Sequence, residues 1–472
     1  MKKWFYSLLL LCGLPALCPA QSLDEVIRLA QDSAITAFQS RYEYEYAQAQ
    51  HARFEALRKP QLQLDITPNY LHFVNDLSRY YVYTRDFDRF STAAQLKLTQ
   101  KVLGLGGEAY VGSQAIWSEY FSRDNIDRPR DFVAAPLIVG YQQSLMGYNP
   151  YRWEKTAEDQ RLEAARKQHA YELHRIAEEA TRRFFRLACA QGKVDMYERN
   201  KQNADTLYAI AREKASIAMV TLAELRSLEL QRLNASNALL NARNEEKLAR
   251  ESLLAYLRVD DSYRFDARLT IPADNGELRM SDEEALQLAL HNSPALEQRQ
   301  LALTEARQQQ EKARREAGVK LGVDLNVGMQ QMSSRFVEAY AKPQFYMLGA
   351  VTVSVPILDH GAAKKGYAAA SSWKSREERA LQEEERALGE DVRTTLENLR
   401  SNRQLLTRTA EAVTMADDLF QLMADDYANG LCDINTYSLA QNRRDNAYNQ
   451  YLTALAAYWT TYYHLLTLTQ HE

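Results

Sequence analysis

The sequence predicts a mainly α-helical protein with a smaller number of β-strands, assembled from two copies of one structural repeat. Long stretches are rich in Ala, Glu, Gln, Arg and Leu, which are strong helix formers. Between them lie short segments in which apolar and polar residues alternate, as in strands with two different faces. The opening segment of the first half recurs in the second half, which indicates an internal repeat.

The N-terminus has the features of a secretory signal peptide over residues 1–20. Two lysines precede an apolar run, and small residues suit cleavage after Ala20. The alternative is a lipoprotein signal with Cys18 lipidated, which Leu17 disfavours because a small residue should precede such a cysteine. No later segment has about 18 consecutive apolar residues, so we expect an exported chain without a transmembrane helix.

The repeat is clearest where each half begins. SLDEVIRLAQDS starts at Ser22 and SDEEALQLALHN starts at Ser281, and each opens with the Ser-x-x-Glu pattern of a helix capping box. Each half continues as helix, strand, strand, long helix, turn and helix. We therefore predict a first repeat over residues 21–265, a linker over 266–280 and a second repeat over 281–472.

Helix lengths point to antiparallel packing of two short helices along one long one. The long helices are expected at 151–213 and 361–429, and the flanking helices at 23–57, 221–256, 282–317 and 435–468. In the second long helix, apolar residues step by sevens as in a coiled coil, although an ordinary amphipathic bundle would show similar stripes. These residues are Val392, Leu399, Leu406, Val413 and Phe420. Near the C-terminus, Tyr458, Trp459, Tyr462 and Tyr463 are expected to pack in the core.

Two strands of the second half each have an apolar and a polar face. The apolar residues are Leu321, Val323, Leu325, Val327, Val351, Val353 and Val355, and the polar ones are Lys320, Asp324, Asn326, Gln330, Thr352 and Ser354. Such strands suit a sandwich or a membrane barrel, and the chain has too few for either alone. Several chains would have to share one barrel, with the apolar set facing lipid and the polar set lining water.

The sequence offers little support for catalysis. The eight histidines are scattered, and His169 and His174 lie five residues apart, which is the wrong spacing for two zinc ligands on one helical face. No Gly-x-Ser-x-Gly, P-loop or Cys-x-x-Cys motif occurs. We therefore expect no enzyme activity, no cofactor and no metal. The near-neutral net charge of -4 gives no argument for nucleic acid as a partner.

The sequence resembles the TolC-like outer-membrane efflux proteins of Gram-negative bacteria. The resemblance rests on the paired openings, on VPILDHGAAKKGYAAA after a strand, and on YANGLCDINTYSLAQNRRDNAYNQY between the last two helices. It implies a homotrimer with one shared β-barrel in the outer membrane and a coiled-coil helical tunnel through the periplasm. It also implies a periplasmic adaptor protein and an inner-membrane transporter as partners.

The resemblance implies passive export of small molecules as the exit duct of a tripartite efflux pump. The alternatives are a duct for type I protein secretion and, from another class, a periplasmic coiled-coil scaffold or adhesin without a pore. The strands count against the scaffold, because their polar faces need water and their apolar faces need burial.

The turns between paired helices are where the resemblance implies a periplasmic aperture. Two positions that are often acidic in the family are Thr436 and Leu439 here. Asp433 could line the aperture or could simply cap the following helix. The candidate aperture residues are Ser216, Asp425, Asp426, Gly430, Asp433, Asn435 and Thr436.

The first half carries an insertion between its two strands, at about 74–133. AAQLKLTQKVL and EAYVGSQAIWSEYF have the pattern of a hairpin turned at Gly104–Gly107. It could be an extracellular extension, or it could add two strands per chain and give eighteen per trimer in place of twelve. On family grounds, the extension is the expectation.

Overall fold

The computed structural model describes residues 22–73, 87–121, 130–145, 147–217, 220–258, 280–429 and 431–471. The predicted signal peptide and Gly430 lie outside these residues, as does all of the predicted linker except its last residue. The chain forms two compact units, and each unit draws on both halves of the sequence. One unit comprises residues 45–164 and 295–384, and the other comprises residues 1–44, 165–294 and 385–472.

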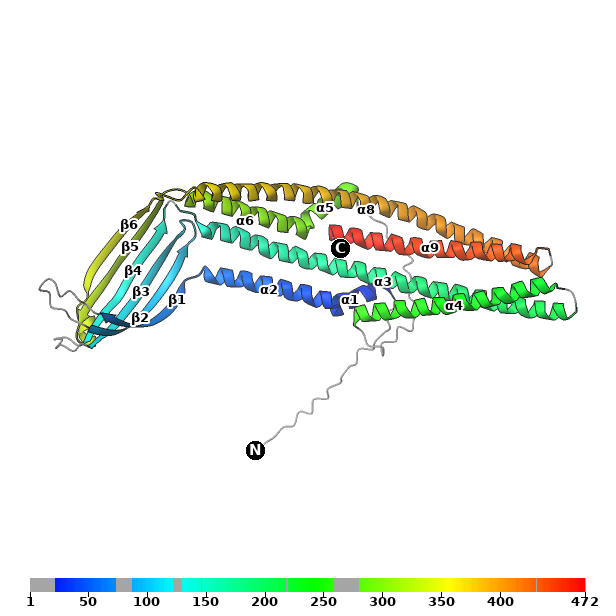
Figure 1. The fold of residues 1–472 in the computed structure, drawn as a ribbon, viewed down its shortest axis with the longest axis horizontal. Coiled ribbons are helices and arrows are strands. Elements are labelled where there is room, and N and C mark those ends of the chain that lie inside the picture. Colours follow the sequence, from blue (N-terminus) through cyan, green and yellow to red (C-terminus); the bar gives the residue numbers. More distant parts are fainter. Residues whose placement is uncertain are drawn as a thin grey trace, which may run out of the picture. The chain divides into compact units, whose positions relative to one another are not determined.

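The first unit contains a six-stranded antiparallel sheet in which the strand order follows the sequence (Figure 1). The strands are β1 (Gln61–Phe73), β2 (Phe87–Val102), β3 (Gly107–Phe121), β4 (Arg130–Ser144), β5 (Lys320–Ser333) and β6 (Gln344–Ser354). A short helix, α7 (Phe336–Ala341), joins β5 to β6. Since each strand pairs only with its sequence neighbours, β1 and β6 are the two edges of the sheet.

The expectation that the inserted hairpin is an extension outside the sheet is wrong. β2 pairs with β1 from Gln61↔Thr99 to Phe73↔Phe87, and β3 pairs with β4 along most of its length. The physical reason is that the hairpin has the same two-faced alternation as its neighbours. Leu98, for example, lies between Leu62 and Val111 on one face.

The turn of this hairpin is held by residues that precede the first long helix. Gly106 has a φ of 78°, a left-handed conformation that glycine adopts at little cost. The Asn149 side-chain amide donates to the Leu103 carbonyl at 3.0 Å, and the Gln143 amide donates to the Leu105 carbonyl at 2.9 Å. The hairpin is therefore fixed at its turn as well as along both strands.

Eight further helices are described along the chain. They are α1 (Leu23–Ser33), α2 (Ile35–Leu57), α3 (Pro150–Ser216), α4 (Leu222–Leu257), α5 (Asp282–Asn292), α6 (Pro294–Glu316), α8 (Ala362–Ala428) and α9 (Ile434–Thr469). α3 and α8 each have 67 residues, and α4 and α9 each have 36. The predicted fold class, mainly helical with long helices and a smaller sheet, is confirmed.

The helices expected at 23–57 and 282–317 are each broken in two. Ala34 leaves the helical conformation with a ψ of 143°, and Ser293 does the same just before Pro294. Proline in a helix removes a backbone donor and clashes with the preceding turn, which explains the second break. At the first break, the Ser33 hydroxyl donates to the Leu257 carbonyl at 2.8 Å, so tertiary contacts support it.

Both predicted capping boxes are present at the helix starts that define the repeat. The Ser22 hydroxyl accepts from the Glu25 backbone N–H at 3.3 Å, and the Glu25 carboxylate accepts from the Ser22 backbone. Ser281 and Glu284 make the same pair of bonds at the start of α5. Each box satisfies two backbone donors that a helix N-terminus otherwise leaves free.

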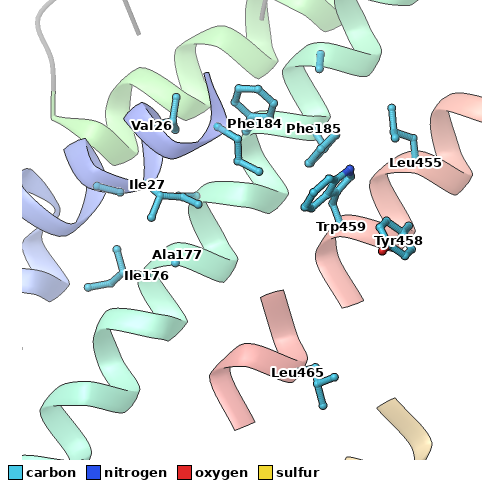
Figure 2. Close-up of a cluster of buried hydrophobic side chains, with 14 of the residues drawn as sticks. Val26, Ile27, Ile176, Ala177, Phe184, Phe185, Leu455, Tyr458, Trp459 and Leu465 are labelled. Atoms are coloured by element: carbon cyan, nitrogen blue, oxygen red, sulfur yellow. The ribbon is translucent and has the colours of Figure 1, made fainter. Parts of the chain in front are cut away.

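The core of the second unit is an aliphatic and aromatic cluster to which α1, α3 and α9 all contribute (Figure 2). Phe184 and Phe185 of α3 are fully buried, and the Phe185 ring stacks on Trp459 at 6.1 Å between centroids. Tyr458 is 1% exposed, which confirms the core role predicted for the C-terminal aromatic group. The same cluster includes Val392, Leu396, Leu399 and Leu406 from the predicted coiled-coil rows of α8.

An ionisable pair joins α3 to α9 beside this core. His464 Nδ1 lies 3.3 Å from the Glu178 carboxylate, which also pairs with Arg182 at 3.1 Å. The hydrogen bond and the negative charge of Glu178 raise the pKa of His464, and the charge of Asp391 acts in the same direction. Burial opposes this shift without cancelling it. The folded protein therefore holds the imidazolium proton more tightly than the unfolded chain does.

We expect this pair to make stability depend on pH. A histidine with a raised folded pKa contributes fully below its unfolded pKa of about 6.5, and loses that contribution as pH rises through the folded value. The thermal midpoint should therefore exceed that of His464→Gln near pH 6, and the difference should shrink towards alkaline pH. The matched control is His291→Gln, an exposed histidine on α5. A difference between His464→Gln and the unaltered protein that is constant with pH would contradict the assignment.

Candidate functional site: the faces of the sheet and the helical tip

The strand register places the two predicted residue sets on opposite faces of the sheet. Leu321 lies opposite Val353 and Val323 lies opposite Val351, so these apolar residues share one face. Lys320 lies opposite Ser354 on the other face, which also carries Thr352, Asp324, Asn326 and Gln330. Val355 follows the end of β6 and is exposed.

The apolar face extends across all six strands. Its members in the other strands, together with three not predicted in β5 and β6, are Leu62, Leu64, Ile66, Leu96, Leu98, Val111, Leu137, Val139, Met329, Phe345 and Met347. On the edge strands these side chains are highly exposed, with Leu62 at 66% and Met347 at 70%. A continuous exposed apolar surface of this kind marks an interaction with protein or membrane.

The polar face also continues into the inserted hairpin, where sequence reasoning assigned no site residues. Gln63, Asp65, Gln95, Lys97, Lys101, Glu108, Gln114 and Gln142 share this face with Asp324 and Asn326. The alternation in AAQLKLTQKVL could have identified the residues of β2. It was not used because the hairpin was assigned outside the sheet.

Side chains on the polar face form a network across β2, β3 and β5. The Tyr110 hydroxyl donates to the Asn326 side-chain oxygen, and the Asn326 amide donates to Asp324 at 3.2 Å. The Lys97 ammonium lies 4.1 Å from the centroid of the Tyr110 ring, within the range of a cation–π contact. This face is therefore bound together laterally by polar groups.

Two tyrosine rings of the polar face lie against glycines of neighbouring strands. A Cβ on Gly140 would be 2.2 Å from Cζ of Tyr110, so no other residue fits there without displacing the ring. A Cβ on Gly328 would be 2.8 Å from the Tyr346 ring. Because these glycines have no side chain, the two tyrosine rings can lie over the neighbouring strands, close to the backbone.

The predicted aperture residues lie at one end of the helical unit. Asp433 is the N-cap of α9, where its carboxylate accepts from the Thr436 backbone N–H at 2.8 Å and from the Thr436 hydroxyl at 2.6 Å. These hydrogen bonds, that of the hydroxyl first, lower the pKa of Asp433. Ser216 ends α3 and donates its hydroxyl to the Glu213 carbonyl at 2.6 Å. The capping alternative for Asp433 is therefore present, and any aperture role would add to it.

The remaining candidates of this end belong to the turn after α8. Asp425 and Asp426 lie in the last turn of that helix, where their carbonyls accept from the backbones of Asn429 and Leu431. Asn435 lies in the first turn of α9. Ser216 lies at the end of α3, so the described candidates lie in the terminal turns of α3, α8 and α9 and at the N-cap of α9.

A small core joins the α3/α4 and α8/α9 hairpins at this end. Phe420 and Tyr437 contact each other at 5.4 Å between ring centroids, and Leu228 is 1% exposed beside them. A cavity of about 630 Å³ lies next to this core and is lined from both hairpins, by Lys214 and Glu224 as well as Tyr427 and Cys432. We call this core and its cavity the tip cluster.

A buried polar group further along the hairpins links α9 to α3 and α8. The Arg444 guanidinium donates to the Asn200 side-chain oxygen and to Asp445 at 3.0 Å, and its Cζ lies 4.0 Å from the Phe420 ring centroid. The Asn200 amide donates to Asp445 at 2.5 Å. Burial raises the pKa of Asp445 even though Arg444 opposes the shift. Parting α3 from α9 would expose or unpair these groups.

The described residues lack two features of other classes of protein. None of the helices among them is long and apolar enough to cross a membrane. Nor do these residues contain a group of three or more His, Cys, Asp and Glu side chains that could hold a metal ion.

Comparison with known proteins shows which solved structures have a similar fold. Residues 285–469 match the family model described as outer membrane efflux protein. The fold is similar to VceC of Vibrio cholerae (TM-score 0.67, 11% identity, 95% of each chain covered). It is also similar to the CmeC channel of Campylobacter jejuni (0.67, 14%, 95% of this chain and 85% of that one) and the MtrE channel of Neisseria gonorrhoeae (0.64, 14%, 96% and 89%). A search of curated proteins gave no match.

The paired long helices and the two-faced sheet give this chain the fold of these solved outer-membrane channels. The match to the outer membrane efflux protein family covers residues 285–469, in the second half of the chain.

We expect Gly140→Ala to destabilise the sheet. The new methyl group would force the Tyr110 ring away and break its bond to Asn326, at a cost of about 1–3 kcal/mol. The matched control is Gly322→Ala on the same face, where the nearest atoms would be 3.9 Å away. Thermal unfolding in detergent should show a lower midpoint for Gly140→Ala only, and equal midpoints would contradict the close approach.

We also expect Asp433→Ala to raise the conductance of the isolated channel in a planar bilayer. Loss of the cap costs about 1 kcal/mol and frays the first turn of α9, which contributes Ile434 and Tyr437 to the tip cluster. The control is Asp433→Ser, which keeps a capping oxygen but removes the charge. If both variants conduct equally well above the unaltered channel, charge and not capping holds the tip.

Proposed function

We propose that three copies of this chain form one duct, with a shared β-barrel in the outer membrane and a helical tunnel below it. The observation that carries this proposal is the pair of open edges on the sheet. Among the residues that the structure describes, nothing pairs with the outer side of β1 or of β6, and such edges readily pair with another chain. In a bilayer every backbone group must be paired, so an open sheet cannot span it.

The strand count makes the two edges complementary. In an antiparallel sheet of six strands, β1 and β6 run in opposite directions. Joining β6 of one copy to β1 of the next therefore continues the antiparallel pattern around a ring. The outer membrane efflux proteins, whose family model matches residues 285–469, form trimeric channels, so we propose that three copies close the ring.

The two faces of the sheet give the closed ring its inside and outside. We assign the apolar face to lipid, with Leu321, Val323, Leu325, Val327, Val351, Val353 and Val355 among its members. We assign the polar face to the lumen, with Lys320, Asp324, Asn326, Gln330, Thr352 and Ser354 among its members. Outer-membrane barrels are apolar outside and polar inside, which supports this orientation.

We propose that the chain is the outer-membrane channel of a tripartite efflux system and that the duct itself is passive, as the resemblance to the outer membrane efflux proteins implies. We infer that an inner-membrane transporter does the work and that a periplasmic adaptor docks the helical end to it. The tip cluster and the Asn200–Arg444–Asp445 group would keep that end closed, since separating the hairpins unpairs buried polar groups and exposes apolar surface. Small molecules are the proposed cargo.

The test is the native mass of the protein extracted in mild detergent from isolated outer membranes. We expect a species of three chains that converts to single chains on heating, and discrete conductance steps after reconstitution into a planar bilayer. A monomer or dimer in the periplasmic fraction would overturn the proposal. Cargo is then tested by the sensitivity of a deletion strain to a panel of small toxic compounds.

A further inference from the structure

We propose that the inserted hairpin is part of the barrel wall, so that the trimer has an eighteen-stranded barrel with a wide aqueous bore. This inference rests on the proposed trimer and adds its strand count, its register between copies and its bore.

The first support is that β2 and β3 are paired on both sides. β2 is bonded to β1 over thirteen residue pairs and β3 is bonded to β4 over eleven, so the hairpin cannot leave the sheet without breaking both of these ladders. Its turn is also held by Asn149 and Gln143, as described above. The hairpin also contributes to both faces, with Leu98 and Val111 on the apolar side and Lys97 on the polar side.

The second support is that the two edges match in length and phase. β1 has 13 residues and β6 has 11, and each begins or ends where the sheet meets the helices. Aligning Gln61 of one copy with Ser354 of the next sets Leu62 opposite Val353 and Gln63 opposite Thr352. Apolar residues then meet apolar residues on one face, and polar residues meet polar ones on the other. A slip by one residue would destroy this match.

The third support is the geometry of an eighteen-stranded ring. Strands lie about 4.8 Å apart and tilt by about 40°, so eighteen give a backbone diameter of roughly 36 Å and twelve give roughly 24 Å. After a layer of side chains is subtracted, the bore is about 24 Å in the first case and about 12 Å in the second. Barrels of 16–18 strands leave an aqueous channel.

The fourth support is that the polar face carries glycines, two of which lie under tyrosine rings. Gly112, Gly140, Gly322 and Gly328 all belong to this face. The rings of Tyr110 and Tyr346 lie over two of these glycines and so do not project far from the backbone. These two tyrosines therefore narrow the bore less than their size would suggest.

Engineered cysteine pairs test the strand count in the full-length protein, with Cys189 and Cys432 replaced by serine. Gln63→Cys with Lys97→Cys should form an intrachain disulfide, detected by mass spectrometry after proteolysis. Gln63→Cys with Thr352→Cys should link copies into dimers and trimers on a denaturing gel. Gln63→Cys with Gln142→Cys should form none, because those strands are about 14 Å apart and a disulfide needs Cα atoms within about 7 Å.

The outcomes separate the two proposals. A trimer in which residues 63 and 142 link and residues 63 and 97 do not has twelve strands, which overturns this inference and leaves the proposed function standing. Absence of any trimer overturns both. The register control is Leu64→Cys with Thr352→Cys, which places the two thiols on opposite faces and should not link copies.

The bore is measured separately with Lys97→Cys on intact cells, labelled from outside by maleimide polymers of increasing size. The mass shift on a gel reports entry and does not require an open tip. We expect labelling by polymers of up to about 12 Å radius, and by small maleimides in every case. A cut-off near about 6 Å would overturn the wide pore.

Discussion

The structure depends on the pairing of backbone hydrogen bonds in the sheet. Five ladders satisfy the interior strands, and two rows of donors and acceptors remain at β1 and β6. In a membrane such rows cannot stay open, because no water is available to satisfy them. In the proposed trimer, the assembly and the assignment of the two faces follow from how these rows are closed. The pairing of backbone groups thus determines the overall arrangement, and side-chain interactions modify it.

Much of the fold could be predicted because its signals are periodic. Alternation over residues 318–330 gave β5 and its two faces, and the steps of seven from Val392 to Phe420 gave a buried row of α8. The capping boxes at Ser22 and Ser281 marked two helix starts to the residue. The predicted division into two sequence repeats stays a prediction, since the compact units observed here cut across it.

The features that could not be predicted from the sequence depend on contacts between segments that are distant in the sequence. No neighbouring proline or glycine indicates the helix break at Ala34. The break is accompanied by a hydrogen bond between Ser33 and Leu257, which are far apart in the sequence. The hairpin of β2 and β3 was placed by analogy with a family, whereas its own alternation matched the sheet. For the site, sequence identified the two faces in β5 and β6. It could not find the Asn200–Arg444–Asp445 group, whose members are joined only by tertiary packing.

The two helical hairpins are capped by different chemistry. Thr221 begins α4 with a neutral hydroxyl, whereas Asp433 begins α9 with a carboxylate. Protonation removes the acceptor charge of Asp433 only, and its lowered pKa defers this to strongly acidic conditions. In a ring of three copies, six hairpin ends would alternate between acid-sensitive and acid-indifferent. Strong acid would then weaken the helix cap of every second hairpin and leave the others unchanged. A ring of six similar hairpin ends would therefore respond to acid with threefold symmetry.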